Sequence, residues 1–261
     1  MIFRETEYAE EMIRGGFLTE KYLFELKLLA KYYNKHDNFD EEKTKEQIKE
    51  FCKKHLSQYN EVLHLDWVLK SVSYGINKKN IMVDIEKINI TQSEIDKIKL
   101  LNNYELEKVA FSMLIFSKSN HDKPRFKPLK KDTGYYINNM TEVFKNAQLE
   151  KSSSKIKEQY LLELSRNGLI EGVQARKNYN HRLKFVDEKY ESNIILTITN
   201  FYDFILEYER YIGLPVGVCE ECKKNLFKKT SNRKKYCKKC WKEIRNKNQR
   251  EIMRKKRNVS I

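Results

Sequence analysis

Apolar side chains recur every three to four positions along much of the chain, the spacing that places them on one face of an α-helix. Leu26 and Leu29 show this spacing near the N-terminus, and Val68 and Val72 show it again further on. Short polar stretches separate these segments and are typical of turns. The pattern predicts a small helical bundle over residues 1–90.

A second series of helices begins near residue 91. Thr91 and Glu94 form the signature of a capping box, in which each side chain bonds to the backbone of the other residue at a helix start. A later helix is expected to turn Ile156 and Leu164 inward. Gly168 suits its C-terminal cap, because glycine readily adopts the left-handed conformation found there.

The order of the central elements carries further information. We expect helices at 140–148 and 155–170, a β-hairpin at 171–187 with a basic tip, and one more helix at 199–213. Helix, turn, helix and hairpin in this order resemble a winged helix-turn-helix. The sequence therefore predicts a winged-helix-like domain over residues 91–213.

Four cysteines form two matched Cys-x-x-Cys pairs, Cys219 with Cys222 and Cys237 with Cys240. Two such pairs can supply four thiolates that surround one zinc ion tetrahedrally. A redox pair usually comes singly in a βαβ setting, and disulfides are rare in the reducing cytosol. We therefore expect one structural Zn²⁺ with no open position for catalysis. The arrangement resembles a treble-clef or ribbon-type zinc finger, expected over residues 217–261.

The positive charge is concentrated in the same part of the chain. Of the formal net charge of +15, residues 219–261 carry 17 Lys and Arg against 4 Asp and Glu, a net charge of +13, which leaves +2 for residues 1–218. An asymmetry of this size indicates a polyanionic partner.

Candidate nucleic-acid contacts follow from this charge. In the finger and the basic helix expected at 240–257 they are Lys228, Lys229, Arg233, Lys234, Lys235, Lys238, Lys239, Lys242, Arg245, Arg250, Arg254, Lys255, Lys256 and Arg257. In the winged-helix candidate they are Ser153, Lys155 and Lys157 at the start of the second helix, and Arg176, Lys177 and Arg182 in the hairpin. A solvated basic tail and a winged helix that binds proteins are the alternatives.

Other features indicate neither an enzyme nor an exported protein. The sequence contains no Gly-rich phosphate loop, nucleophile elbow or acidic metal cluster, so we expect no catalytic residues and no enzymatic activity. Cys52 lies on an apolar helical face and is expected to be a core residue. The acidic N-terminus and the lack of a long apolar run predict a cytoplasmic protein, in a bacterial host, with no membrane contact.

One stretch of the N-terminal region resembles a known family. The segments ELKLLAKYY (25–33), IKEFCKKHLSQYNEV (48–62) and WVLKSVSYGI (67–76) are similar to the small helical domain at the C-terminus of many phage and plasmid primases. The proline-rich turn of that family is replaced here by SQYNEVLHLD. The whole arrangement resembles DNA-binding proteins of phages and mobile elements of AT-rich Gram-positive bacteria. The resemblance implies a context of replication or regulation and no activity.

The sequence thus predicts a mainly α-helical protein that binds nucleic acid, double-stranded DNA in preference to RNA, in replication or transcription regulation. Two alternatives stay open: a phage protein that modulates a host polymerase or defence factor, and an RNA-binding protein.

Overall fold

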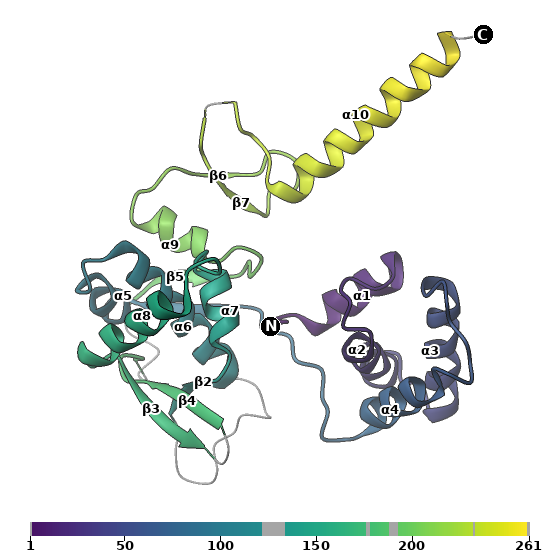
Figure 1. Ribbon diagram of the computed structural model, residues 1–261, viewed down its shortest axis with the longest axis horizontal. Coiled ribbons are helices and arrows are strands. Elements are labelled where there is room, and N and C mark those ends of the chain that lie inside the picture. Colours follow the sequence, from purple (N-terminus) through teal and green to yellow (C-terminus); the bar gives the residue numbers. More distant parts are fainter. Residues whose placement is uncertain (1, 122–133, 176–177, 188–192, 232, 260–261) are drawn as a thin grey trace. The chain divides into compact units, whose positions relative to one another are not determined.

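The structure is a computed structural model that describes residues 2–121, 134–175, 178–187, 193–231 and 233–259. The chain divides into two compact units, Met1–Glu86 and Lys87–Ile261. The described residues are mainly α-helical and include small β-sheets (Figure 1).

The first unit is helical, with α1 (Glu5–Gly15), α2 (Tyr22–Lys35), α3 (Glu41–His55) and α4 (Leu65–Ile76). Helix α2 packs against the other three and buries Leu26 and Leu29 completely. A Cβ atom added to Gly75 would lie 2.6 Å from the backbone of Ala30, so the backbones of α2 and α4 approach closely at this glycine. The core of this unit is apolar, as the helical spacing predicted, and it includes Cys52.

The second unit contains more varied elements. In chain order they are β1 (Ile88–Thr91), α5 (Gln92–Lys99), α6 (Tyr104–His121), β2 (Tyr135–Ile137), α7 (Met140–Asn146), α8 (Ser154–Arg166), β3 (Ile170–Ala175), β4 (Asn178–Leu183), β5 (Ile194–Ile198), α9 (Ile205–Tyr211), β6 (Val216–Val218), β7 (Leu226–Lys228) and α10 (Lys238–Val259).

Helix α6 lies at the centre of this unit. It contacts α5, α7, α8 and α9 as well as strands β1, β2 and β4. Nearly all of its side chains from Val109 to Asn120 are therefore buried, including the polar Ser112 and Ser117. Because neighbouring elements contact α6 on several sides, this part of the helix has no exposed face.

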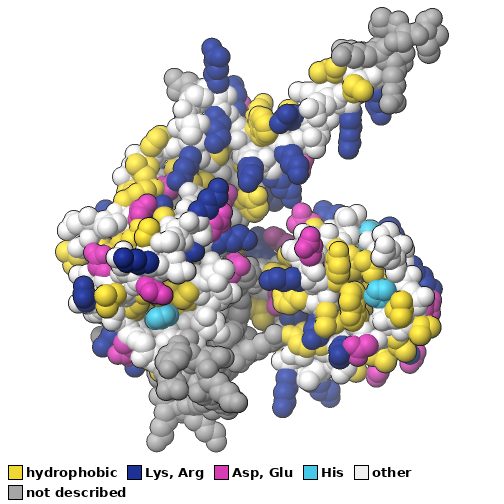
Figure 2. Space-filling view, viewed as in Figure 1, with side chains coloured by type: hydrophobic (Ala, Val, Ile, Leu, Met, Phe, Trp, Pro, Cys, Tyr) yellow, Lys and Arg dark blue, Asp and Glu magenta, His cyan; other side chains and the backbone are white. Residues whose placement is uncertain are grey.

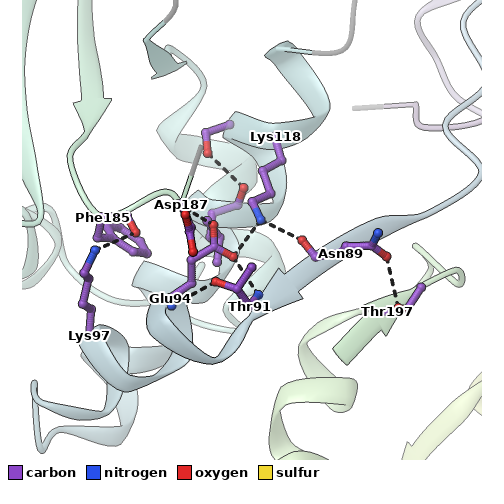
Figure 3. A network of polar contacts seen from close by, with 10 residues as sticks. Asn89, Thr91, Glu94, Lys97, Lys118, Phe185, Asp187 and Thr197 are labelled. Atoms are coloured by element: carbon purple, nitrogen blue, oxygen red, sulfur yellow. Dashed lines mark hydrogen bonds and ion pairs between the residues drawn. The ribbon is translucent and has the colours of Figure 1, made fainter. Parts of the chain in front are cut away.

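A buried polar network joins the start of α5 to α6 (Figure 3). Thr91 and Glu94 form the predicted capping box. The Nζ atom of Lys118 lies 2.7 Å from the Glu94 carboxylate and donates to the backbone oxygen of Asn89, also at 2.7 Å. The backbone N–H of Asp187 donates to the other Glu94 oxygen at 2.9 Å. The charge on Lys118 and the backbone N–H groups of Thr91 and Asp187 thus satisfy one carboxylate that has no exposure to solvent.

Helices α7 and α8 precede a three-stranded antiparallel sheet with the order β2-β4-β3. Helix α8 begins at the N-cap Ser153, whose hydroxyl accepts from the backbone N–H of Ile156 at 3.3 Å. It ends at Asn167, after which Gly168 has a φ of +71°. The N–H of Leu169 then donates to the carbonyl of Leu164. The predicted glycine cap is confirmed, because this closing bond needs a left-handed residue.

Three details differ from the sequence predictions. Ile156 is 40 % exposed, because only the later part of α8, around Leu164, is buried. Helix α9 begins at Ile205 rather than near 199, since turns occupy the preceding residues. The hairpin tip is shorter than predicted, because Asn178 and the residues after it already belong to β4.

Candidate metal centre and its basic surroundings

A short hairpin and the start of a helix position the four cysteines. Strands β6 and β7 pair antiparallel, with Val218 opposite Leu226, and Cys219 follows β6 directly. The backbone N–H of Cys219 donates to the carbonyl of Asn225 at 2.9 Å, and that of Lys223 donates to the carbonyl of Cys219 at 3.0 Å. These bonds close a tight turn around Cys222. The turn brings its sulfur back towards the hairpin.

The second pair lies at the start of α10. Cys237 comes just before the helix, and Cys240 lies in its first turn. The backbone N–H of Cys240 points at the Cys237 sulfur, with 3.5 Å between the two atoms, and the Asn225 amide nitrogen lies 3.6 Å from the same sulfur. Donors of this kind stabilise a thiolate, so the helix start suits a metal-binding sulfur.

The structure brings all four predicted ligands together. Their sulfur atoms lie within 4.8 Å of one another, and Cys219, Cys237 and Cys240 are buried. The ring of Phe227 packs on the sulfurs from one side and that of Tyr236 contributes a partly buried surface. Four convergent sulfurs with an apolar cover could hold a single metal ion.

The electrostatics of the cysteines agree with a shared ligand set. Burial tends to raise the pKa of Cys219, but backbone N–H groups at Cys222 and Cys237 outweigh it and lower that pKa to about 6. Burial, followed by hydrogen bonding with the other three sulfurs, raises the pKa of Cys240. The four thiols therefore compete for protons, and a metal cation that binds them displaces those protons.

The donor set fits a zinc ion by its chemistry. All four donors are sulfurs, and soft thiolate ligands select zinc or iron–sulfur chemistry over calcium and magnesium, which prefer oxygen. With four protein ligands, such a site is closed to substrate. A zinc ion here would stabilise the hairpin and fix the start of α10.

The finger is attached to the rest of the second unit through a buried carboxylate. Glu209 in α9 is 1 % exposed and lies 2.7 Å from the Nζ atom of Lys228 in β7. The hydroxyl of Tyr104 donates to the same carboxylate at 2.5 Å. The Asn200 amide nitrogen adds a 2.7 Å bond to the carbonyl of Lys224. Lys228, predicted as a phosphate contact, therefore neutralises a buried acid and stabilises this attachment.

Most other predicted contacts of the finger lie on its surface. Figure 2 shows dark blue side chains over the finger and along α10. The exposed ones are Lys229, Arg233, Lys234, Lys235, Lys238, Lys239, Lys242, Arg245, Arg250 and Arg254. Lys235 also lies 3.5 Å from Glu220, and Arg245 lies over the ring of Trp241.

The predicted nucleic-acid contacts of the winged-helix candidate differ in their surroundings. Ser153 caps α8, and Lys155 is exposed beside it. Lys157 donates to the carbonyl of Glu150 at 2.8 Å, and Arg182 lies 3.4 Å from Glu171. Arg176 and Lys177 lie outside the described residues, as do the side chains of Lys255, Lys256 and Arg257.

Two site residues were missed by sequence reasoning. Glu209 lies in an ordinary amphipathic segment, and nothing local marks it as the partner of a lysine in the finger. Asn225 lies near the Cys237 sulfur. Polar residues between two cysteine pairs are common, so its place in the sequence does not mark it. Trp241, by contrast, could be recognised from the sequence, because it is a large aromatic residue in a helix rich in charged side chains.

Comparisons with protein-family models, with curated proteins and with solved structures give no match for this chain. Among the described residues, no helix combines the length and the apolar character needed to cross a bilayer.

Proposed function

We propose that this chain is a non-enzymatic, zinc-containing DNA-binding protein. One observation carries the proposal: the cysteine cluster fixes the start of a long helix whose basic side chains face solvent. Lys242, Lys247, Arg250 and Arg254 are exposed and form no ion pair with any described residue. Cations that are exposed on a helix and form no ion pair there suit the phosphates of a nucleic acid.

The central elements support the same proposal. A helix α6, a strand β2, the pair α7 and α8, and a hairpin β3–β4 follow one another, and β4 pairs with both β2 and β3. This order and pairing resemble those of a winged helix-turn-helix, in which the second helix of the pair enters the major groove. Helix α8, with Lys155 exposed at its start, would then read bases while the finger and α10 contact phosphates.

The proposal is tested with the full-length protein and a duplex DNA. Replacing Lys242, Lys247, Arg250 and Arg254 by Ala removes four phosphate contacts. We expect a much weaker affinity and a flatter plot of log K against log salt, by up to about four units of slope, because each lost contact removes roughly 0.9. Fluorescence anisotropy at several salt concentrations measures both quantities.

A matched control removes four charges elsewhere. Lys21, Lys54, Lys78 and Lys79 are exposed in the first unit and take part in no ion pair with a described residue. Their replacement by Ala should leave affinity and salt slope nearly unchanged. Equal losses in both variants would show that only net charge matters, and unchanged binding in the α10 variant would refute the proposal.

A second candidate function rests on one apolar surface. Val62 and Leu63 are 82 % and 77 % exposed, and Leu65 and Leu69 beside them are also exposed. Clustered exposed apolar residues are typical of protein-binding sites. A protein partner of the first unit would co-purify with the chain after nuclease treatment and would be lost on replacing Val62 and Leu63 by Ser.

A further inference from the structure

A pocket of about 570 Å³ opens beside the cysteine cluster, between the turn that precedes Cys237 and the start of α10. Its volume lies in the range of sites that bind small organic groups. Tyr236 and Trp241 line it, and they flank the ligand pair Cys237 and Cys240 in the sequence. Two aromatic rings therefore form part of the wall of this pocket, and each belongs to a residue next to a candidate metal ligand.

The exposed indole is the unusual part of this pocket. Trp241 is 52 % exposed, although burying an aromatic ring of this size is strongly favourable. The guanidinium of Arg245, which does not line the pocket, lies 5.3 Å from the ring centroid. That contact restrains the ring and leaves half of it open. An open, restrained aromatic surface is suited to stacking with another planar group.

Every charged residue that lines the pocket is a cation: Arg233, Lys234, Lys235 and Lys238. Lys234 also lies over the ring of Phe227, with 5.6 Å between its Nζ atom and the centroid, and Phe227 packs on the cysteines. Lys234 is therefore in contact with the same small core that Tyr236 packs against. Together the cations and the aromatic rings offer one surface for a planar ring and another for a negative group, within a single pocket.

A nucleotide carries both of these groups, a flat base and a phosphate. An acidic peptide would use the cations and leave the rings without a partner. A base within a duplex keeps its faces stacked on its neighbours, so a ring can stack on Trp241 only where the base is unpaired. We propose that this pocket binds one unpaired nucleotide of DNA, with the base stacked on Trp241 and the phosphates near Arg233 and Lys238.

This inference rests on the proposed DNA binding and adds to it a preference. The chain would bind a duplex that ends in a single-stranded segment more tightly than a blunt duplex. Since base stacking on aromatic residues contributes about 5- to 150-fold in affinity, the preference should lie in that range. The aromatic residues accept any base, so the preference should depend little on sequence.

The test uses the full-length protein with Trp67→Phe, which leaves Trp241 as the only tryptophan of the two in the chain. Three DNAs share one duplex: a blunt form, a form with a thymidine overhang, and a form whose overhang has the same phosphates without bases. We expect the thymidine overhang to bind about 5- to 150-fold tighter than the abasic overhang and to quench the Trp241 emission. Equal affinity for these two overhangs, with unchanged emission, would overturn the inference.

The variant Trp241→Ala, measured by anisotropy, completes the test. It should lose the preference for the thymidine overhang while it retains salt-sensitive binding to the blunt duplex and a full complement of metal. A preference that survives in this variant would also overturn the inference. If none of the three DNAs binds at low salt, both the inference and the proposed function fail; if all three bind equally, only the inference fails.

Discussion

The first unit and the finger are stabilised by different means. In the first unit, α2 buries its apolar face against α1, α3 and α4, and side chains such as Leu29 and Ile48 have no exposure to solvent. In the finger, the small core consists of cysteines with Phe227 and part of Tyr236. The first unit can therefore fold through burial of apolar surface, whereas the finger needs a covalent or metal link.

Because of this difference, the residues that stabilise the finger are not the residues that carry its positive charge. A region with a large apolar core uses the inward faces of its helices for apolar side chains. The described residues of the finger and α10 bury few side chains, and residues 219–261 include 17 Lys and Arg. Holding the fold with four sulfurs leaves the remaining positions open to phosphate contacts.

The largest expected effect is that of removing one sulfur. Cys237→Ser should abolish metal binding and unfold the finger, because structural zinc supplies about 10–16 kcal/mol in isolated finger peptides. Metal analysis should give one ion per chain before the change and none after it. Hydrogen exchange should rise in β6 and β7 and stay constant in α2 and α4.

Cys52→Ser is the matched control for this prediction. Cys52 is buried in the first unit, and burial raises its pKa to about 11, so it remains a neutral thiol. Its replacement should leave the metal content unchanged and destabilise only the first unit. Loss of metal in this variant, or retention of metal in Cys237→Ser, would contradict the comparison.

The next effect in size is a cavity in the first unit. Leu29→Ala should lower its free energy of unfolding by about 2–5 kcal/mol, because Leu29 is fully buried among apolar side chains. Urea denaturation followed by the fluorescence of Trp67, in a Trp241→Phe background, measures it. Leu63→Ala, at an exposed position, should change the same quantity by less than about 0.5 kcal/mol. A loss of metal content in Leu29→Ala would show that the two regions are coupled.

A smaller effect is expected where the finger is attached to α9. Lys228→Met leaves the Glu209 carboxylate buried without its cation and should weaken the attachment by about 1–3 kcal/mol. The readout is faster hydrogen exchange in α9 and β7 at full metal content. Lys229→Met removes the same charge from an exposed neighbour and should have little effect. Similar exchange in both variants would rule out a special role for Lys228.

The smallest effect concerns acidification of the first unit. Burial, and then the charge of Lys54, lower the pKa of His55 below its ordinary value of 6.5. The folded unit therefore holds the imidazole neutral, while the unfolded chain takes up a proton below about pH 6.5. The contribution of His55 to the free energy of unfolding should be fully present above that pH and decrease as the pH drops from 6.5 towards the folded pKa. Urea midpoints near pH 7 and near pH 5 measure it.

His55→Phe keeps a ring beside Phe51 and removes the titrating group. The unfolding midpoint of the first unit should then vary less across this range of pH. In the finger we expect acid to act through another route, since protonation of the thiolates would release a bound metal ion. A midpoint of the first unit that falls equally with and without His55 would assign its acid sensitivity to other groups.

Local features of the fold could be predicted from the sequence. The capping box at Thr91 and the glycine cap at Gly168 each depend on a few neighbouring residues, and the structure has both. The cysteine cluster was predictable for a related reason, because the spacing within each pair fixes the geometry of two ligands. The identity of the metal stays a prediction.

Features that depend on distant residues could not be predicted. Strand β1 pairs with β5 far along the chain, and no residue near β1 indicates that partner. Ile156 was expected to be buried, because helical spacing places it on the same face as Leu164. The spacing does not show how much of that face is covered, and the packing partners of α8 cover only its later part. Lys228 looked like its basic neighbours, and only the position of Glu209 in α9 distinguishes it.

The pairing of β1 with β5 also has a consequence for synthesis on the ribosome. The side chains of Asn89 and Thr197 bond to each other across 108 positions. At a translation rate of about 5–20 residues per second, β1 waits roughly 5–20 s for its partner strand to be made. The first unit, which ends at residue 86, can fold during that interval. The unpaired edge of β1 is then exposed to other nascent chains, so slower translation after residue 91 would favour misassembly of the second unit alone.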